Sequence, residues 1–137
     1  MKPKLSIYLL FDGNCVSAMQ FYKSVFPGVL TLTKVAESTI KDMMPPDSHH
    51  KVINARLIND QVDISASDWL HPVERPIHGN MVCLYLNGGS KEELTTLFDK
   101  LAVGANVTDP LAEMFFGLYG ALQDAYGIRW MFQANNP

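Results

Sequence analysis

The chain has 137 residues, of which 47% are hydrophobic and 18% charged, a composition typical of globular proteins and not of disordered or collagen-like chains. Its 11 Lys and Arg against 14 Asp and Glu leave a net charge of −3, so we expect no nucleic-acid partner. The longest apolar stretches fall far short of the roughly 20 residues of a membrane-spanning helix. Residues 1–4 lack the apolar core of a secretory signal. These features favour a cytoplasmic location and no membrane partner.

The first predicted unit is a strand followed by a helix. Residues 5–11 form an apolar, strand-like run, and apolar residues then recur at the spacing of one helix face. Asn14 is placed to cap the start of this helix, and Pro27-Gly28 to end it. The stripe consists of Cys15, Ala18, Met19, Tyr22, Val25 and Phe26.

Three strands are predicted after this helix, at 29–37, 51–58 and 61–67, with a turn at Asn59-Asp60. Residues 39–50 include Pro45-Pro46 and are predicted to form an inserted loop between the first two of these strands. The first half therefore follows the order β-α-β-β-β.

A second strand–helix unit follows the same plan. The apolar run 81–86 leads through two glycines to Ser90-Lys91-Glu92-Glu93, which has the Ser-x-x-Glu form of a capping box. Gly104 is placed to end the helix, whose apolar stripe consists of Leu94, Leu97, Phe98 and Leu101. Three further strands are predicted at 105–112, 117–124 and 128–133, with a turn at 125–127.

The two units lie at a constant spacing, since 76 residues separate Gly13 from Gly89 and also Gly28 from Gly104. We therefore predict an α+β fold in which one β-α-β-β-β module occurs twice within a single domain, 1–137. Module 1 spans 1–69, a linker with two prolines spans 70–76, and module 2 spans 77–137. In each module we expect the helix to cover one face of a sheet and to leave the opposite face open.

Motifs of nucleophilic catalysis and nucleotide binding are absent from the sequence. It contains no Gly-x-Ser-x-Gly, Walker A or Gly-x-Gly-x-x-Gly pattern. Cys15 and Cys83 fall within a predicted helix and a predicted strand, so we expect small buried thiols in a reducing compartment and no disulfide.

Motifs near both ends of the chain carry a resemblance to a known family. The closing run 114–130 contains Tyr-Gly-x-x-x-Asp-x-x-Gly-x-x-Trp, and further motifs occur at 8–14, 18–28, 54–57 and 64–68. Through them the chain resembles PhnB-like proteins of the vicinal oxygen chelate superfamily. That superfamily also contains glyoxalase I, extradiol dioxygenases and bleomycin or fosfomycin resistance proteins.

This resemblance implies the glyoxalase/bleomycin resistance fold, in which two β-α-β-β-β modules form a curved mixed sheet around a pocket, commonly in a homodimer. Superfamily enzymes use that pocket to bind a divalent metal, which polarises neighbouring substrate oxygens. The metal ligands of such relatives are His, Glu or Gln on the first strand of each half and near its end. The corresponding positions here hold Ile7 or Tyr8, Asn80 or Met81, and Trp130 or Met131, and Asn54 stands where many PhnB-like proteins have His.

None of these side chains is a ligand that a divalent ion prefers. Among the four histidines, those of the insertion and the linker are expected to be solvated. His78 is the best remaining candidate, and Asp68 and Glu113 could join it only if both point into the pocket. We therefore assign no cofactor, and a divalent metal held by these three residues is the alternative.

The predicted pocket is lined by one polar face of the sheet and by aromatic side chains. Asp63, Ser65, Ser67 and Asp68 alternate with apolar residues, so one sheet face is predicted to carry hydroxyls and carboxylates. Asp124, which precedes Tyr126-Gly127, is interpreted as a turn former and not as a catalytic acid. The predicted pocket residues are Tyr8, Phe11, Asn54, Arg56, Ser67, Trp69, Phe116, Tyr119 and Trp130.

Three functional hypotheses follow. The leading one is a protein that binds a small polar or aromatic molecule in the pocket without a superfamily-type metal site. The second is a metal-dependent lyase, isomerase or dioxygenase that uses His78 and carboxylates. The third is a resistance-type dimer that sequesters a cationic drug. In each hypothesis the partner is a small molecule, and we expect a homodimer.

Overall fold

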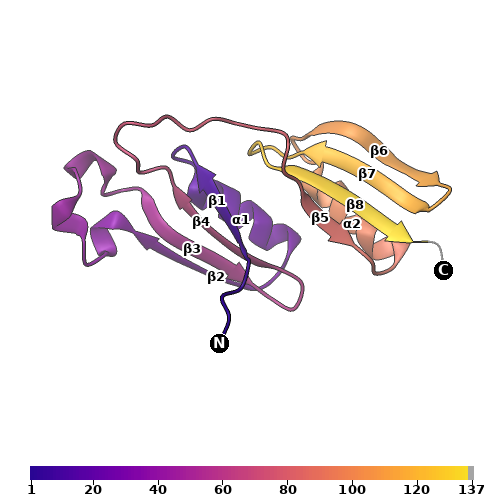
Figure 1. The fold of residues 1–137 in the computed structure, drawn as a ribbon, viewed down its shortest axis with the longest axis horizontal. Helices are drawn as coiled ribbons and strands as arrows, with labels where there is room; N and C mark the ends of the chain where they lie inside the picture. Colours follow the sequence, from indigo (N-terminus) through magenta and orange to yellow (C-terminus); the bar gives the residue numbers. More distant parts are fainter. Residues whose placement is uncertain (136–137) are drawn as a thin grey trace. The chain divides into compact units, whose positions relative to one another are not determined.

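The computed structural model describes residues 1–135. The chain divides into two compact units, Met1–Pro76 and Ile77–Pro137. The boundary falls at the predicted start of module 2, and each unit contains one β-α-β-β-β module (Figure 1). Neither α-helix in the described part of the chain is long and apolar enough to cross a membrane.

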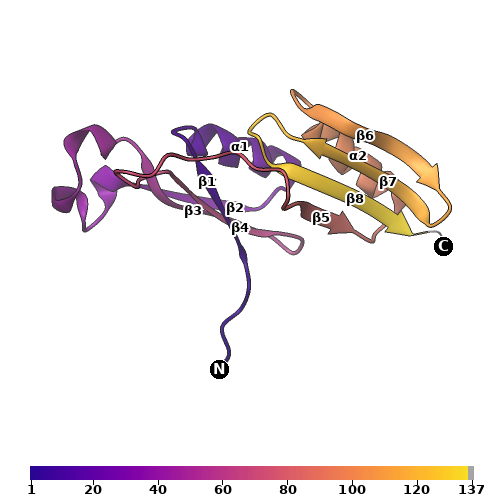
Figure 2. The ribbon, with the colours of Figure 1, turned by 45° about the horizontal axis from the view of Figure 1, so that its top comes forward.

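The first unit is a four-stranded mixed sheet with one helix. Its strand order is β1-β4-β3-β2, in which β1 runs parallel to β4 and the other pairs are antiparallel. The elements are β1 (Ile7–Phe11), α1 (Cys15–Val25), β2 (Val29–Lys34), β3 (Val52–Ile58) and β4 (Asp63–Asp68). Helix α1 contacts β2, β3 and β4, and Figure 2 shows it along one side of this sheet.

The core of the first unit lies between α1 and the sheet. The helix buries the predicted apolar stripe, and the sheet contributes buried residues that mostly alternate along each strand. The buried apolar sheet residues are Leu9, Phe11, Val52, Ala55, Leu57, Ile64 and Ala66.

The inserted segment between β2 and β3 is built from short turns. Strand β2 ends at Lys34 and not at the predicted Glu37, because a 3-10 turn begins at Val35. His49 Nε2 lies 2.8 Å from the carbonyl oxygen of Lys41 and 3.2 Å from that of Met44. Since both partners are acceptors, Nε2 carries the proton and fixes the loop.

The second unit repeats the arrangement, with the strand order β5-β8-β7-β6 and β5 parallel to β8. Its elements are β5 (Leu84–Asn87), α2 (Lys91–Leu101), β6 (Asn106–Met114), β7 (Gly117–Gln123) and β8 (Arg129–Asn135). The predicted α+β fold with two β-α-β-β-β modules is confirmed, as two four-stranded mixed sheets.

Helix α2 buries Leu94, Phe98 and Leu101, whereas Leu97 of the predicted stripe is only half-buried. These three residues lie 76 positions after Ala18, Tyr22 and Val25 of α1, so the repeat holds for the buried faces of the helices. Phe98 contacts Phe132 of β8 edge-on, with ring centroids 4.9 Å apart.

The two helices begin differently. Ser90 Oγ accepts a hydrogen bond of 3.0 Å from the backbone N–H of Glu93, so the predicted cap of α2 is confirmed. The predicted cap by Asn14 is wrong, because its side chain makes no capping hydrogen bond. The first backbone N–H of α1, that of Cys15, donates instead to Asp68 Oδ1 at 3.0 Å.

The repeat spacing fails at the strand that precedes each helix. Leu86 pairs with the buried Phe132 and lies on the helix side, whereas Leu10, 76 positions earlier, faces away from α1. Strand β5 begins only at Leu84, so Cys83 lies before it and is half-exposed. The expectation of a buried thiol is therefore confirmed for Cys15 and wrong for Cys83; both thiols are free.

Candidate functional site

The face of the first sheet opposite α1 carries most of the predicted polar residues. Ser65 of β4 is paired with Tyr8 of β1 on one side and with Arg56 of β3 on the other, and Ser67 is paired with Leu10. Directly opposed residues of paired strands share a face. By the same alternation Asn54 belongs to this face, so the predicted residues Tyr8, Asn54, Arg56 and Ser67 come together from three strands.

A charged pair stands on this open face. Arg56 donates through Nε to Asp63 Oδ1 and through Nη2 to Asp63 Oδ2, both at 2.8 Å. The hydrogen bond from Arg56 lowers the pKa of Asp63, and the same contact raises the pKa of Arg56. Because both side chains are exposed, this pair adds little to stability, but it presents a fixed, bidentate polar feature to a ligand on the face.

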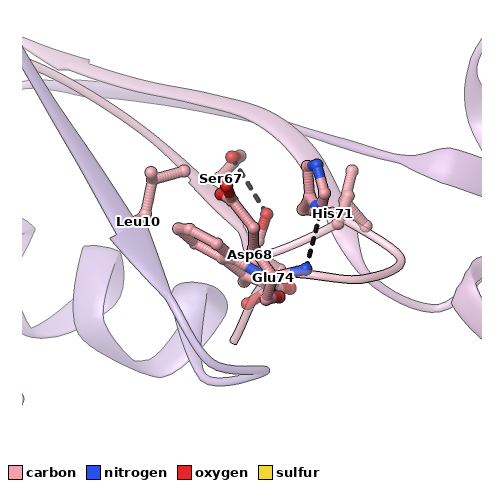
Figure 3. A pocket seen from close by; sticks show the side chains of 7 residues that line it. Leu10, Ser67, Asp68, His71 and Glu74 are labelled. Atoms are coloured by element: carbon pink, nitrogen blue, oxygen red, sulfur yellow. Dashed lines mark hydrogen bonds between the residues drawn. The ribbon is translucent and has the colours of Figure 1, made fainter. Parts of the chain in front are cut away.

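A pocket of about 260 Å³ lies where the open face meets the chain that follows β4 (Figure 3). Leu10 and Ser67 reach it from the sheet, and the turn 69–74 forms the rest of its wall. The lining residues are Leu10, Ser67, Asp68, Trp69, Leu70, His71 and Glu74. Two of them, Ser67 and Trp69, were predicted as pocket residues from the sequence.

Backbone and side-chain hydrogen bonds fix the turn 69–74. The backbone N–H of Trp69 donates to Phe11 O at 2.6 Å, and its indole Nε1 donates to Glu74 O at 2.8 Å. His71 Nδ1 accepts from the backbone N–H groups of Val73, at 3.2 Å, and of Glu74, at 2.8 Å. Residues 70–76, predicted as a plain linker, thus begin with an ordered turn that holds the Trp69 ring in place.

Ser67 and Asp68 face opposite sides of the sheet. The Ser67 hydroxyl donates to Asp68 O at 3.0 Å, as Figure 3 shows. The Asp68 carboxylate lies on the α1 side, where Oδ1 accepts from Cys15 N and Oδ2 from Val52 N at 2.8 Å. The prediction that Asp68 shares a face with Ser67 is wrong, because adjacent strand residues alternate.

Two predicted pocket residues lie in the hydrophobic core instead. Phe11 and Trp130 are 3% and 1% exposed. The ring of Phe11 packs near that of Tyr22 in α1. Trp130 Nε1 donates to Asp124 Oδ2 at 2.8 Å, while Asp124 Oδ1 accepts from the backbone N–H of Tyr126. The interpretation of Asp124 as a turn former is therefore confirmed.

The last two predicted residues, Phe116 and Tyr119, belong to the second unit. Phe116 lies in the turn between β6 and β7, where its ring packs against those of Phe115 and Tyr119. The Tyr119 hydroxyl donates to Asp109 Oδ2 at 3.4 Å. Burial, followed by the neighbouring Asp109, raises the pKa of Tyr119, so it is held as a neutral phenol.

The residues present do not fit a superfamily-type metal. Tyr8 and Asn54 lie on the open face of the first sheet, and Asn80 and Met81 are exposed and precede β5. Among residues 1–135 no group of three or more His, Cys, Asp or Glu side chains could hold a metal ion.

The three candidate metal ligands, Asp68, Glu113 and His78, each make other contacts. Asp68 binds two backbone N–H groups. Glu113 pairs with Lys91 at 2.8 Å. The His78 ring lies against Gly127, where an added Cβ would be 2.5 Å from Nδ1.

Sequence reasoning missed Leu10, Leu70, His71 and Glu74 as pocket residues. His71-Pro72 was placed in a linker, and no local pattern shows that the chain turns back on Trp69. A signal was present in hindsight, since a side-chain acceptor two or three residues before free backbone N–H groups is the spacing of an Asx-type turn.

The fold places the chain in a recognised class. Solved structures described as glyoxalase/bleomycin resistance protein/dioxygenase proteins, from Burkholderia phytofirmans PsJN and Frankia, are 15% and 16% identical, both with a TM-score of 0.63. The alignment with the Burkholderia structure covers 96% of this chain and 97% of that one, and the alignment with the Frankia structure covers 99% and 94%. The protein therefore has the glyoxalase/bleomycin resistance fold.

The family is defined more narrowly by sequence. The family model described as 3-demethylubiquinone-9 3-methyltransferase matches residues 3–133, so the chain belongs to this PhnB-like family. Protein YjdN of Escherichia coli K12 is 29% identical over 140 residues, covering 93% of this chain and 92% of YjdN. Protein PA1353 from Pseudomonas aeruginosa is 30% identical with a TM-score of 0.86, covering 99% and 100% of the two chains.

Proposed function

We propose that this protein binds a small organic molecule on the face of its first sheet that α1 leaves uncovered, and that it does so without a superfamily-type metal centre. The observation that carries the proposal is the pocket of about 260 Å³ at the end of that face. Pockets for drug-sized ligands span roughly 300–1,000 Å³, so this one suits a smaller molecule.

The chemistry of the pocket supports the same proposal. Apolar walls from Leu10, Trp69 and Leu70 surround a few polar groups, which is the usual composition of a small-molecule site. The turn that forms one wall is already held by four hydrogen bonds, so little ordering is needed when a ligand binds.

The proposal is tested by screening a library of small organic fragments against the ¹⁵N-labelled protein in the presence of EDTA. We expect binders to move the amide signals of residues 10, 67–71, 73 and 74. Leu10→Trp should fill the pocket and abolish these shifts, whereas Val29→Trp, at another exposed strand position, should not. Binding that requires an added metal, or shifts that avoid these residues, would contradict the proposal.

A further inference from the structure

We infer that this pocket selects a protonated amine carried on a flat apolar body. The inference rests on the proposed function, because it specifies the ligand class of the same pocket. Three features carry it: one uncommitted carboxylate, a hydroxyl that can only accept, and an immobilised indole ring.

The charge at the pocket is negative. Asp68 directs its carboxylate to the backbone of Cys15 and Val52, on the other side of the sheet. Glu74 is exposed, and within residues 1–135 no hydrogen bond or ion pair engages its carboxylate. None of the described residues that line the pocket is Lys or Arg. A cation is therefore attracted there, and a carboxylate ligand is repelled.

The hydroxyl of Ser67 adds a matching acceptor. Its single proton is donated to Asp68 O at 3.0 Å, which leaves only lone pairs for a ligand. Ser67 is 6% exposed, so a ligand donor that reaches it is largely removed from water. An ammonium group has three donors and no acceptor, and it fits a site that offers the acceptors of Ser67 and Glu74.

The Trp69 ring supplies the complementary surface. Its Nε1–H donates a hydrogen bond to the backbone oxygen of Glu74, so the indole is held by the same residue that carries the free carboxylate. A cation within about 6 Å of an indole face is attracted by the ring quadrupole. Leu10 and Leu70 give the apolar contacts that a flat hydrocarbon body needs.

His71 contributes one donor of fixed position. Because Nδ1 accepts from two backbone N–H groups, the ring proton lies on Nε2. His71 therefore offers no acceptor to the amine and can serve a hydroxyl or carbonyl elsewhere on the ligand.

The test compares three probes of similar shape: 2-phenylethylamine, 2-phenylethanol and 3-phenylpropionate. Each is titrated into ¹⁵N-labelled protein while the Trp69 Nε1–H signal, assigned with Trp69→Phe, and the Glu74 amide are followed. We expect the amine to bind roughly tenfold more tightly than the alcohol, as for one charge-assisted contact, and the acid least. Added salt should weaken only the amine's binding.

The matched variants are Glu74→Gln and Glu92→Gln, the second at an exposed carboxylate of α2 that does not line the pocket. Glu74→Gln should bring the amine to the affinity of the alcohol, and Glu92→Gln should change nothing. Equal or tighter binding of the alcohol or the acid at these signals overturns the inference while the proposed function stands. If no probe moves these signals, the inference is overturned, and the fragment library decides the proposed function separately.

Discussion

At the scale of single residues, Asp68 joins three elements of the first unit. It ends β4, and its two carboxylate oxygens accept from the first residue of α1 and the first residue of β3. The side chain is 3% exposed, so neither backbone donor has ready access to water as a substitute. The Asp68 carboxylate thus holds β4, α1 and β3 together, although Asp68 is one of the residues that line the pocket.

Replacing Asp68 with Asn should therefore destabilise the protein. One amide group can accept from only one of the two donors without presenting its own N–H to the other, at a cost of about 2–3 kcal/mol. Urea unfolding followed by circular dichroism measures the change. Asp63→Asn, on the exposed face, should cost clearly less, because its ion pair with Arg56 is screened by solvent. Equal effects of the two substitutions would contradict this role of Asp68.

The two thiols should differ in reactivity. Burial, and then the charge of Asp68, raise the pKa of Cys15 to about 12 from 9.0, so its reactive thiolate is not formed near neutral pH. Cys83 is half-exposed. Ellman's reagent should titrate one thiol per chain in the native protein and two in denaturant, and Cys83→Ser should abolish the native reaction. Fast labelling of native Cys83→Ser would contradict this prediction.

The same shift fixes the sign of a pH effect on folding. The unfolded thiol loses its proton near pH 9.0, whereas folded Cys15 keeps it to about pH 12. The unfolded state then binds fewer protons, so this contribution to the free energy of unfolding is complete below pH 9 and is lost as the pH rises toward 12. Cys15→Ala should remove this part of the alkaline decline in urea-unfolding midpoints. An unchanged decline would contradict it.

At the scale of elements, the two helices offer a matched test of capping. Ser90 Oγ accepts from Glu93 N at 3.0 Å, whereas the Asn14 side chain makes no such bond. Ser90→Ala should cost about 1 kcal/mol of unfolding free energy, and Asn14→Ala should cost clearly less. Thermal and urea unfolding of both variants measure the difference. A larger loss in Asn14→Ala would show that the hydrogen bond from the Cys15 backbone N–H to the Asp68 carboxylate is not sufficient to anchor the start of α1.

The helices were predictable to within two residues because apolar stripes, a Ser-x-x-Glu cap and Gly104 act locally. Gly104 follows α2 with a left-handed φ of +73°. The strands were less predictable at their ends, since β5 starts three residues later than its apolar run. Met81 and Val82 have strand-like character, but among residues 1–135 the pairing of β5 with β8 begins only at Leu84. Pairing across a sheet is a tertiary property that a local pattern does not contain.

The candidate site was likewise predictable only where a local pattern decides the position of a residue. Alternation along β4 placed Ser67 on an open face, and Trp69 followed from its position after the strand. Phe11 and Trp130 were misplaced because aromatic composition does not distinguish a core from a pocket wall. The contribution of His71 and Glu74 depends on hydrogen bonds that close a turn, and these become visible only when the backbone is folded.

At the scale of the whole molecule, one module occurs twice but is fastened differently in each copy. In the first unit a buried aspartate links a strand end to a helix and a second strand. In the second unit the buried Asp124 accepts hydrogen bonds from the turn between β7 and β8 and from the indole of Trp130. At the start of α2, the side chain of Ser90 accepts the hydrogen bond that caps the helix. The halves have thus kept a common order of elements while their polar contacts diverged.

The homodimer that the family resemblance implies stays a prediction, and the apolar residues that precede edge strand β5 offer a test of it: Ile77, Met81 and Val82 are 92%, 94% and 82% exposed. Adjacent exposed apolar side chains and an unpaired strand edge both favour association. Sedimentation velocity at micromolar concentration should give about twice the chain mass of 15.3 kDa. The double variant Met81→Lys/Val82→Lys should sediment as a monomer, whereas Met43→Lys, at a 76% exposed position of the insertion, should not. A monomeric parent protein, or dissociation by Met43→Lys alone, would show that this segment is not the interface.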